Sequence, residues 1–142
     1  MTDGKKTEKK FVDFCNKCGY YKLRLQVDSG RGFGVSNAMP ADYLVITEHS
    51  TFFVEVKEVD RKDNKFVFSR LRQQSKLTKI YEILNPNVHA CIFIYYTNLK
   101  KVVFMFIEDY NRLYLNSKKK SFIDYEDIPL EYKVDLDVFR LI

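Results

Sequence analysis

Several residue types are scarce in this sequence. Of its 142 residues, three are cysteine, three are proline and five are glycine, and tryptophan is absent. So few cysteines exclude a disulfide-rich scaffold, and so little proline and glycine excludes a flexible linker between domains. The longest apolar runs, residues 90–96 and 102–107, are far shorter than the roughly 20 residues of a membrane-spanning helix. We therefore expect one compact domain that does not span a membrane.

The amino-terminal residues are polar and charged, without the apolar stretch of a secretory signal. No internal repeat or low-complexity tract is visible. We expect the protein to stay in the cytoplasm of its cell, or of a host cell if it is viral.

The cysteines and histidines are too scattered for a strong metal motif. Cys15 and Cys18 have the spacing of half a zinc site, but no second pair accompanies them. Three residues apart on a helix, both thiols are predicted to pack inward. His49 and His89 lack a neighbour that would make either a convincing catalytic base.

Positive charge is abundant and unevenly spread. The formal net charge is +5, yet residues 122–142 carry six acids against two bases, a net charge of −4. Residues 1–121 therefore carry about +9. This balance favours a polyanionic partner, although any single lysine is better explained as a solvated surface residue.

Hydrophobic periodicity predicts alternating helices and strands. Phe11, Phe14, Cys15 and Cys18 recur at helical spacing, with Gly19 as the helix stop. A second helix is predicted to begin within residues 69–77. Its apolar stripe is formed by Leu77, Ile80, Tyr81 and Leu84. The predicted strands cover residues 20–27, 43–46, 52–57, 88–97 and 101–108. One helix between the third and fourth of these strands predicts a parallel, right-handed crossover.

A group of polar side chains lies within the predicted hairpin of residues 43–57 and directly before it. Glu55 and Lys57 are two residues apart on one strand, so they point to the same face. Asp42 precedes the neighbouring strand, and the hairpin brings it back toward Glu55. Converging carboxylates repel unless a cation lies between them, and such hard oxygen ligands suit Mg²⁺ or Mn²⁺. A nearby lysine would orient water or neutralise developing charge during phosphodiester hydrolysis.

These residues match the PD-(D/E)xK pattern of restriction-endonuclease-like nucleases, with one alanine inserted between Pro40 and Asp42. Residues 4–115 together resemble a Holliday-junction resolvase of that superfamily, of the archaeal, Gram-positive bacterial or phage type. The resemblance implies an α/β fold with a restriction-endonuclease-like core, a mixed central sheet flanked by helices, and an acidic carboxyl-terminal extension over about residues 116–142. It also implies one nuclease domain over residues 1–142.

The resemblance also implies roles for individual residues. Gly4 and Glu8 correspond to the family's glycine and metal-binding glutamate on the first helix, and a glutamine near the scissile phosphate corresponds best to Gln73, with Gln74 as the alternative. The implied metal ligands are Glu8, Asp42, Glu55 and the main-chain carbonyl of Val56, holding one or two Mg²⁺ or Mn²⁺ ions. The implied catalytic residues are Asp42, Glu55, Lys57 and Gln73. The implied DNA-binding residues are Arg24, Ser29, Arg31, Arg70 and Arg72.

The resemblance further implies a homodimer acting on a four-way DNA junction, because two symmetrical cuts need two sites related by a twofold axis. Tyr20, Tyr21 and Phe33 are candidates for its interface. Two alternatives stay open, since one core serves many functions. The first is a related nuclease acting on flaps, ends or duplex DNA, and the second is a DNA-binding module that does not cut.

Overall fold

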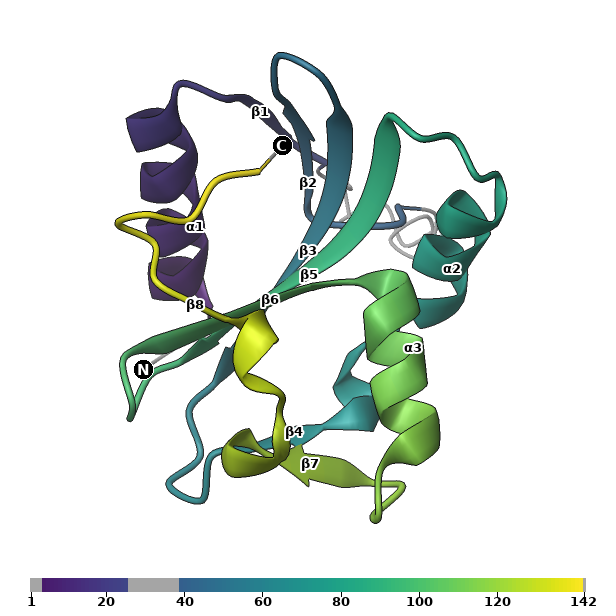
Figure 1. Ribbon diagram of the computed structural model, residues 1–142. Helices are drawn as coiled ribbons and strands as arrows, with labels where there is room; N and C mark the ends of the chain where they lie inside the picture. The colour runs from purple at the N-terminus through teal and green to yellow at the C-terminus, as the bar shows by residue number, and fades with distance from the viewer. Residues whose placement is uncertain (1–3, 26–38, 142) are drawn as a thin grey trace, which may run out of the picture.

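A mixed six-stranded sheet organises the molecule in the computed structural model, which describes residues 4–25 and 39–141 (Figure 1). The three helices are α1 (Lys5–Cys18), α2 (Gln74–Glu82) and α3 (Ile107–Asn116). The strands of the large sheet, in spatial order, are β1 (Tyr21–Arg24), β2 (Tyr43–Ile46), β3 (Thr51–Val59), β5 (Val88–Tyr96), β6 (Lys101–Phe106) and β8 (Lys133–Val134). A second sheet pairs β4 (Lys65–Val67) with β7 (Phe122–Asp124). The predicted α/β class with helices around a mixed sheet is confirmed.

The strand pairings that the sequence predicted are present in the sheet. β2 and β3 form an antiparallel hairpin in which Tyr43 lies opposite Val54. β3 and β5 run parallel through α2, with Glu55 opposite Ile92, and this is the predicted crossover. β5 returns antiparallel into β6. β3 is therefore central, and it carries Glu55 and Lys57 along the middle of the sheet.

α1 is amphipathic, and its apolar stripe covers one face of the sheet. Phe11 and Cys15 are fully buried, and the Phe11 ring lies 5.3 Å from the Tyr43 ring and 5.0 Å from the Phe93 ring. Burying one phenylalanine contributes roughly 2–3 kcal/mol. The helix ends at Gly19, whose φ of 76° lies in the left-handed region that glycine adopts without strain. The predicted helix stop is confirmed.

α2 is shorter than its apolar pattern suggested. A 3-10 turn occupies Phe68–Arg70, and the α-helix begins only at Gln74. Leu77 is buried as predicted, but Leu84 lies beyond the helix end with a φ of 60° and is 71% exposed. The prediction that Leu84 continues the apolar stripe is wrong, because the left-handed backbone at this residue turns the chain away from the core.

Two apolar cores lie on the two faces of the sheet. The core under α1 contains Phe11, Phe52 and Phe93, whereas the core under α2 and α3 contains Leu77, Ile92 and Tyr110. Alternate residues of β3 and β5 enter opposite cores, which explains why these strands are almost continuously apolar. Glu55, Lys57 and Glu58 interrupt this apolar pattern on β3, and both glutamates are buried.

The acidic carboxyl-terminal segment is part of both sheets. It supplies β7 and β8, and its Ile123, Ile128 and Leu141 are buried. The last residues cross α1 (Figure 1). The Tyr20 hydroxyl accepts a hydrogen bond from the Leu141 N–H at 2.9 Å and donates one to the Leu141 carbonyl at 3.0 Å. Tyr20 therefore contributes to the protomer's own packing.

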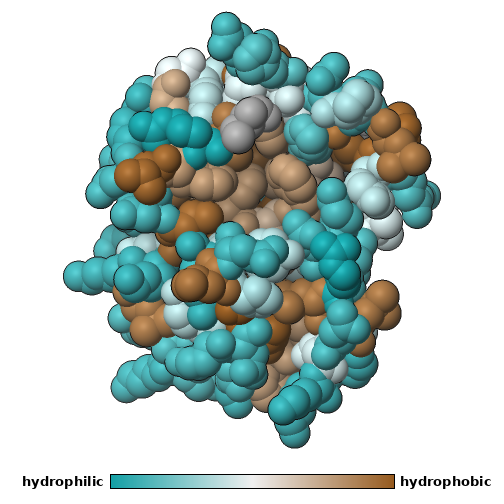
Figure 2. All heavy atoms as spheres, in the orientation of Figure 1, coloured by the Kyte–Doolittle hydropathy of each residue, from teal (hydrophilic) through white to brown (hydrophobic). Residues whose placement is uncertain are grey.

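The surface is mixed in character. Figure 2 shows hydrophobic side chains across the upper middle of one face, surrounded by hydrophilic ones. Of the predicted interface residues, Tyr21 is 60% exposed, while Phe33 lies outside the described residues. Within the described ranges, no helix is long and apolar enough to cross a membrane.

Candidate active site

The predicted polar residues line one cleft of about 580 Å³. The cleft lies where α1 begins, where β2 begins, and where the second half of β3 faces the turn before α2. Its lining residues are Gly4, Thr7, Glu8, Asp42, Glu55, Val56, Lys57, Glu58, Arg70, Arg72 and Gln73. Segments that are far apart along the chain therefore present their charged groups to one opening.

Glu55 and Lys57 form an ion pair deep in the cleft. The Lys57 Nζ lies 3.0 Å from the Glu55 Oε2, and the two side chains are 16% and 3% exposed. They share one face of β3 as the alternation of a strand requires. The other carboxylate oxygen of Glu55, Oε1, is buried without a hydrogen-bond partner among the described residues. An acceptor left unsatisfied at this depth has a site open for a donor or a cation.

The pKa of Glu55 is raised to about 7. Burial is the largest cause, because it disfavours the charged carboxylate, and the negative charge of Asp42 adds to it. The Lys57 ammonium opposes both effects. Glu55 therefore changes its charge near neutral pH, and a further cation in the cleft would favour its ionised form.

Asp42 is held by main-chain and side-chain groups at the start of β2. Its Oδ2 accepts a hydrogen bond from the Val56 N–H at 3.0 Å. This bond places the aspartate beside the segment of β3 that carries Glu55. The predicted convergence of Asp42 and Glu55 on one opening is what the hairpin produces.

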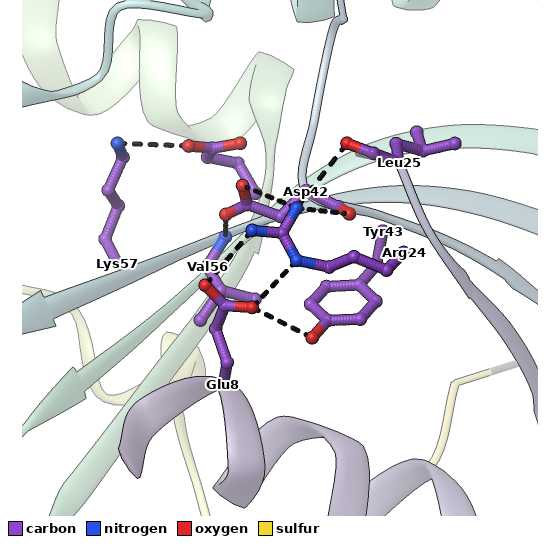
Figure 3. A network of polar contacts seen from close by, with 8 residues as sticks. Glu8, Arg24, Leu25, Asp42, Tyr43, Val56 and Lys57 are labelled. Atoms are coloured by element: carbon purple, nitrogen blue, oxygen red, sulfur yellow. Dashed lines mark hydrogen bonds and ion pairs between the residues drawn. The ribbon is translucent and has the colours of Figure 1, made fainter. Parts of the chain in front are cut away.

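Arg24 lies between two acids at the rim of the cleft (Figure 3). Its Nε is 2.9 Å from the Glu8 Oε1, and its Nη1 is 3.7 Å from the Asp42 Oδ1. The Tyr43 hydroxyl donates a further hydrogen bond to Glu8 at 3.0 Å, and the guanidinium lies 5.4 Å from the Tyr43 ring. Arg24, predicted to bind DNA, thus neutralises two of the predicted metal ligands here.

The two adjacent glutamines occupy different environments. Gln73 lines the cleft, and its buried Oε1 has no partner among the described residues. The Gln74 Nε2 instead donates a hydrogen bond of 2.7 Å to the Asn111 Oδ1 on α3. Gln73, the residue favoured by the sequence, is therefore the glutamine that faces the cleft.

The predicted DNA-binding residues are placed only in part. Arg70 and Arg72 line the cleft, and the Arg70 Nη1 donates a hydrogen bond to the main-chain carbonyl of Glu58. Both arginines lie on the side of the cleft opposite α1. Ser29 and Arg31 lie outside the described residues.

Two cleft residues were missed by the sequence analysis. Thr7 is buried and donates a hydrogen bond of 2.6 Å from its hydroxyl to the Glu58 Oε1. Glu58 follows Lys57 directly, so strand alternation points it toward α1, away from the face of Glu55 and Lys57. The pair ties the first turn of α1, where Glu8 lies, to the end of β3.

The oxygen atoms that line the cleft are of the kind that bind divalent cations, but the acids are not gathered around one point. Within residues 4–25 and 39–141, no three His, Cys, Asp or Glu side chains are grouped so that they could hold a metal ion. Arg24 pairs with two of these acids, Glu8 and Asp42. The buried, unpartnered Oε1 atoms of Glu55 and Gln73 are hard acceptors of the kind that Mg²⁺ and Mn²⁺ prefer.

The cysteines lie outside this cleft. Cys15 lies on the buried face of α1, and burial raises the pKa of its thiol to about 12. Cys18 is partly buried and packs against the same core. The predicted inward packing is confirmed for Cys15, and the pair makes no zinc site in the described part of the chain.

Comparisons with known proteins extend this description. No protein-family model matches the sequence, and a search of curated proteins also finds no match. Among solved structures, the chain is similar to Hjc, a Holliday junction resolvase from the archaeal hyperthermophile Archaeoglobus fulgidus, with a TM-score of 0.59 and 18% sequence identity. The match covers 87% of this chain and 89% of Hjc. The restriction-endonuclease-like fold predicted from the sequence is thereby confirmed.

Proposed function

We propose that this chain is a metal-dependent, structure-selective endodeoxyribonuclease that resolves four-way DNA junctions. The observation that carries the proposal is the placement of Asp42, Glu55 and Lys57 in one cleft of a restriction-endonuclease-like fold. Structural similarity to an archaeal junction resolvase supports the choice of DNA structure. The net positive charge of residues 1–121 supports a polyanionic substrate.

The residues that would hold Mg²⁺ or Mn²⁺ are Asp42, Glu55 and the main-chain carbonyl of Val56, with Glu8 joining them when Arg24 releases it. A bound ion of this kind supplies a Lewis acid for the phosphate and lowers the pKa of a coordinated water. The Glu8–Arg24 pair is partly exposed, and exposed ion pairs are worth only about 0–1 kcal/mol. Exchanging Arg24 for a divalent cation is therefore energetically accessible.

The other polar groups of the cleft act on the phosphate and the attacking water. Lys57 holds its ammonium beside Glu55, where it can stabilise the negative charge that develops on the phosphate. Gln73 offers an unpartnered oxygen that can accept a hydrogen bond from the attacking water. This hydrogen bond would orient the lone pairs of the water. Arg70 and Arg72, on the far side of the cleft, would contact the neighbouring phosphates.

Paired cuts across a junction require two such clefts. We propose a twofold-symmetric homodimer, because an isologous interface presents two identical sites related by the same symmetry as the junction. Among the predicted interface residues, exposed Tyr21 on edge strand β1 is the best placed to contribute.

A substrate panel tests the proposal. Purified protein is incubated with a synthetic four-way junction, a flap and a linear duplex, each with Mg²⁺ or with EDTA, and the products are sized on denaturing gels. We expect paired symmetrical nicks in the junction with Mg²⁺ and none with EDTA. The control is Asp42→Asn, which keeps the size of the side chain but removes its charge.

The other outcomes separate the alternatives. Faster metal-dependent cutting of flaps, ends or duplex would replace junction resolution with another nuclease activity. Binding of all three substrates without metal-dependent cutting would identify a DNA-binding module and overturn the enzymatic proposal.

A further inference from the structure

A second polar groove lies beside the cleft, at the end of the sheet where β5 turns into β6. Its volume is about 540 Å³. α1, the turn between β5 and β6, and the chain on either side of β8 contribute to its walls (Figure 1). The lysines that line it are Lys10, Lys100, Lys101 and Lys133.

These lysines have no carboxylate partner in the described part of the chain. None of the four appears in an ion pair there. The groove also contains Asp135 and Asp137, so its lining carries four positive and two negative side chains. Asp137 lies 3.6 Å from the Lys17 Nζ, and the Asp135 Oδ1 accepts a hydrogen bond of 2.9 Å from the Asp137 N–H. The lysines outnumber the acids, so the groove keeps a net positive charge that favours an anion.

Two of these ammonium groups are held against aromatic rings. The Lys10 Nζ lies 4.8 Å from the centre of the Tyr95 ring, and the Lys133 Nζ lies 4.2 Å from the centre of the Tyr125 ring. Such cation–π contacts are worth about 0.5–1 kcal/mol at exposed sites and restrict a flexible side chain. A lysine ordered in this way loses less conformational entropy when it binds an anion. This ordering distinguishes the groove from a surface of freely moving lysines.

The groove adjoins the cleft through the sheet and through α1. Tyr95 of the groove lies opposite Glu58 of the cleft in the β3–β5 register, and neighbouring strands are about 4.8 Å apart. Lys10 follows cleft residue Thr7 by three positions on α1, so the two lie one above the other on the same face of the helix. A DNA strand that enters the cleft can therefore continue past the lysines, because it carries one phosphate for about every 3.4 Å of duplex axis.

We propose that this groove binds the phosphodiester backbone of the duplex arm that flanks the cleaved phosphate. The inference rests on the proposed nuclease function, since it assumes that DNA occupies the neighbouring cleft. It goes further by assigning Lys10, Lys100, Lys101 and Lys133 to one arm of the substrate. The contacts are to phosphates, so they favour no nucleotide sequence.

The test compares two double variants that remove the same charge from different surfaces. Lys100→Gln/Lys101→Gln removes two exposed groove lysines, while Lys118→Gln/Lys119→Gln removes two exposed lysines beyond α3. Binding to a four-way junction, a linear duplex and a single strand is titrated by fluorescence anisotropy in EDTA, between 50 and 200 mM salt. Thermal unfolding checks that both variants are folded.

We expect the groove variant to bind the junction and the duplex about tenfold more weakly, with a salt slope reduced by about 1–2. The control variant should lose no more than twofold. Lys133→Gln should reproduce about half of the change in slope. A smaller loss for single strands than for duplex supports an arm in the groove.

Equal behaviour of the two double variants would overturn the inference and leave the lysines as solvated surface residues. So would a loss confined to the single strand. The titrations contain no divalent metal, so they are independent of cutting. If the substrate panel shows no cleavage while the groove variant still binds weakly, the proposed nuclease activity falls and the binding surface stands.

Discussion

Two of the ion pairs at the cleft lie at different depths. Glu55 and Lys57 at the floor are 3% and 16% exposed, whereas Glu8 and Arg24 at the rim are 29% and 39% exposed. A buried pair cannot lose one partner without leaving an uncompensated charge, while an exposed pair is solvated when it separates. The floor is therefore rigid and the rim is adaptable. A site built in this way keeps its reactive geometry while its outer charges rearrange around a substrate or an ion.

The largest expected effect comes from neutralising the floor. Glu55→Gln preserves shape but removes a ligand charge, so we expect metal-dependent cutting to fall by at least about 10³-fold. Junction affinity in EDTA should stay within about threefold of wild type, because distributed basic residues supply it. Single-turnover cleavage and anisotropy measure the two quantities. Wild-type turnover in Glu55→Gln would remove this residue from the site.

Removing the lysine of the same pair should affect both rate and stability. Lys57→Met should slow cutting by about 10²–10⁴-fold, the usual range for losing a positioned acid–base group. It should also lower the free energy of unfolding at pH 8, because Glu55 loses the ammonium that favours its ionised form and its pKa rises further. Near pH 5 the stability loss should be small, since the carboxyl is then protonated. Denaturant unfolding at both pH values checks this, and an equal loss at each would contradict it.

The pH dependence of metal binding sharpens the comparison further. The pKa of Glu55 is raised from 4.5 to about 7, so between these values the unfolded state ionises before the folded one, and stability falls as pH rises. Mn²⁺ needs the ionised form, so its affinity should rise about tenfold per pH unit below 7 and level off above. Calorimetric titrations from pH 5.5 to 8.5 measure this. Glu55→Gln should lose the slope, and a flat wild-type profile would refute the assignment.

The adjacent glutamines provide a matched pair of smaller effect. Gln73→Ala removes a group that faces the cleft and should slow cutting about tenfold, the equivalent of one hydrogen bond in the transition state. Gln74→Ala should leave the rate unchanged and lower stability by about 1 kcal/mol, because it loses its bond to Asn111. Single-turnover rates and thermal unfolding separate the two. The reverse pattern would assign the catalytic glutamine to Gln74.

The smallest effect is expected at the rim. Arg24→Gln should lower stability by no more than about 1 kcal/mol in EDTA, as expected for an exposed pair. Because Glu8 and Asp42 lose a competing cation, Mn²⁺ should bind a few-fold more tightly and raise the unfolding temperature more than in wild type. Calorimetry and thermal unfolding with and without Mn²⁺ measure both quantities. Weaker Mn²⁺ binding would show that Arg24 does not compete with the ion.

The parts of the fold that were predicted correctly are those with a strong local pattern. The stripe of Phe11, Phe14 and Cys15 is sufficient to identify α1, and a single helical segment between two apolar strands is sufficient to make β3 and β5 parallel. Strands β4, β7 and β8 are two or three residues long, too short for any periodicity. Their pairing depends on contacts between distant segments, which one sequence does not reveal.

The same distinction applies to the candidate site. Glu55 and Lys57 could be predicted together because two residues on one strand share a face. The bridge from Arg24 to Glu8 joins β1 to α1, and its geometry depends on how the helix packs against the sheet. The hydrogen bond between Thr7 and Glu58 spans 51 residues and leaves no spacing pattern. Side-chain contacts of this kind follow from tertiary packing.

The last residues of the chain bind to α1 and to Tyr20 just after it. These contacts connect the carboxyl-terminal segment to the helix that carries Glu8. Leu141 is bound at Tyr20, just beyond the helix, and the Lys17 ammonium donates a hydrogen bond to the Leu136 carbonyl at 3.0 Å. A helix transmits displacement as a nearly rigid rod of about 1.5 Å per residue. We therefore expect that loosening the carboxyl end of α1 shifts Glu8 near its other end. A substitution in the last residues would then change the position of Glu8, the acid that pairs with Arg24. More than 100 residues separate Glu8 from these last residues along the chain.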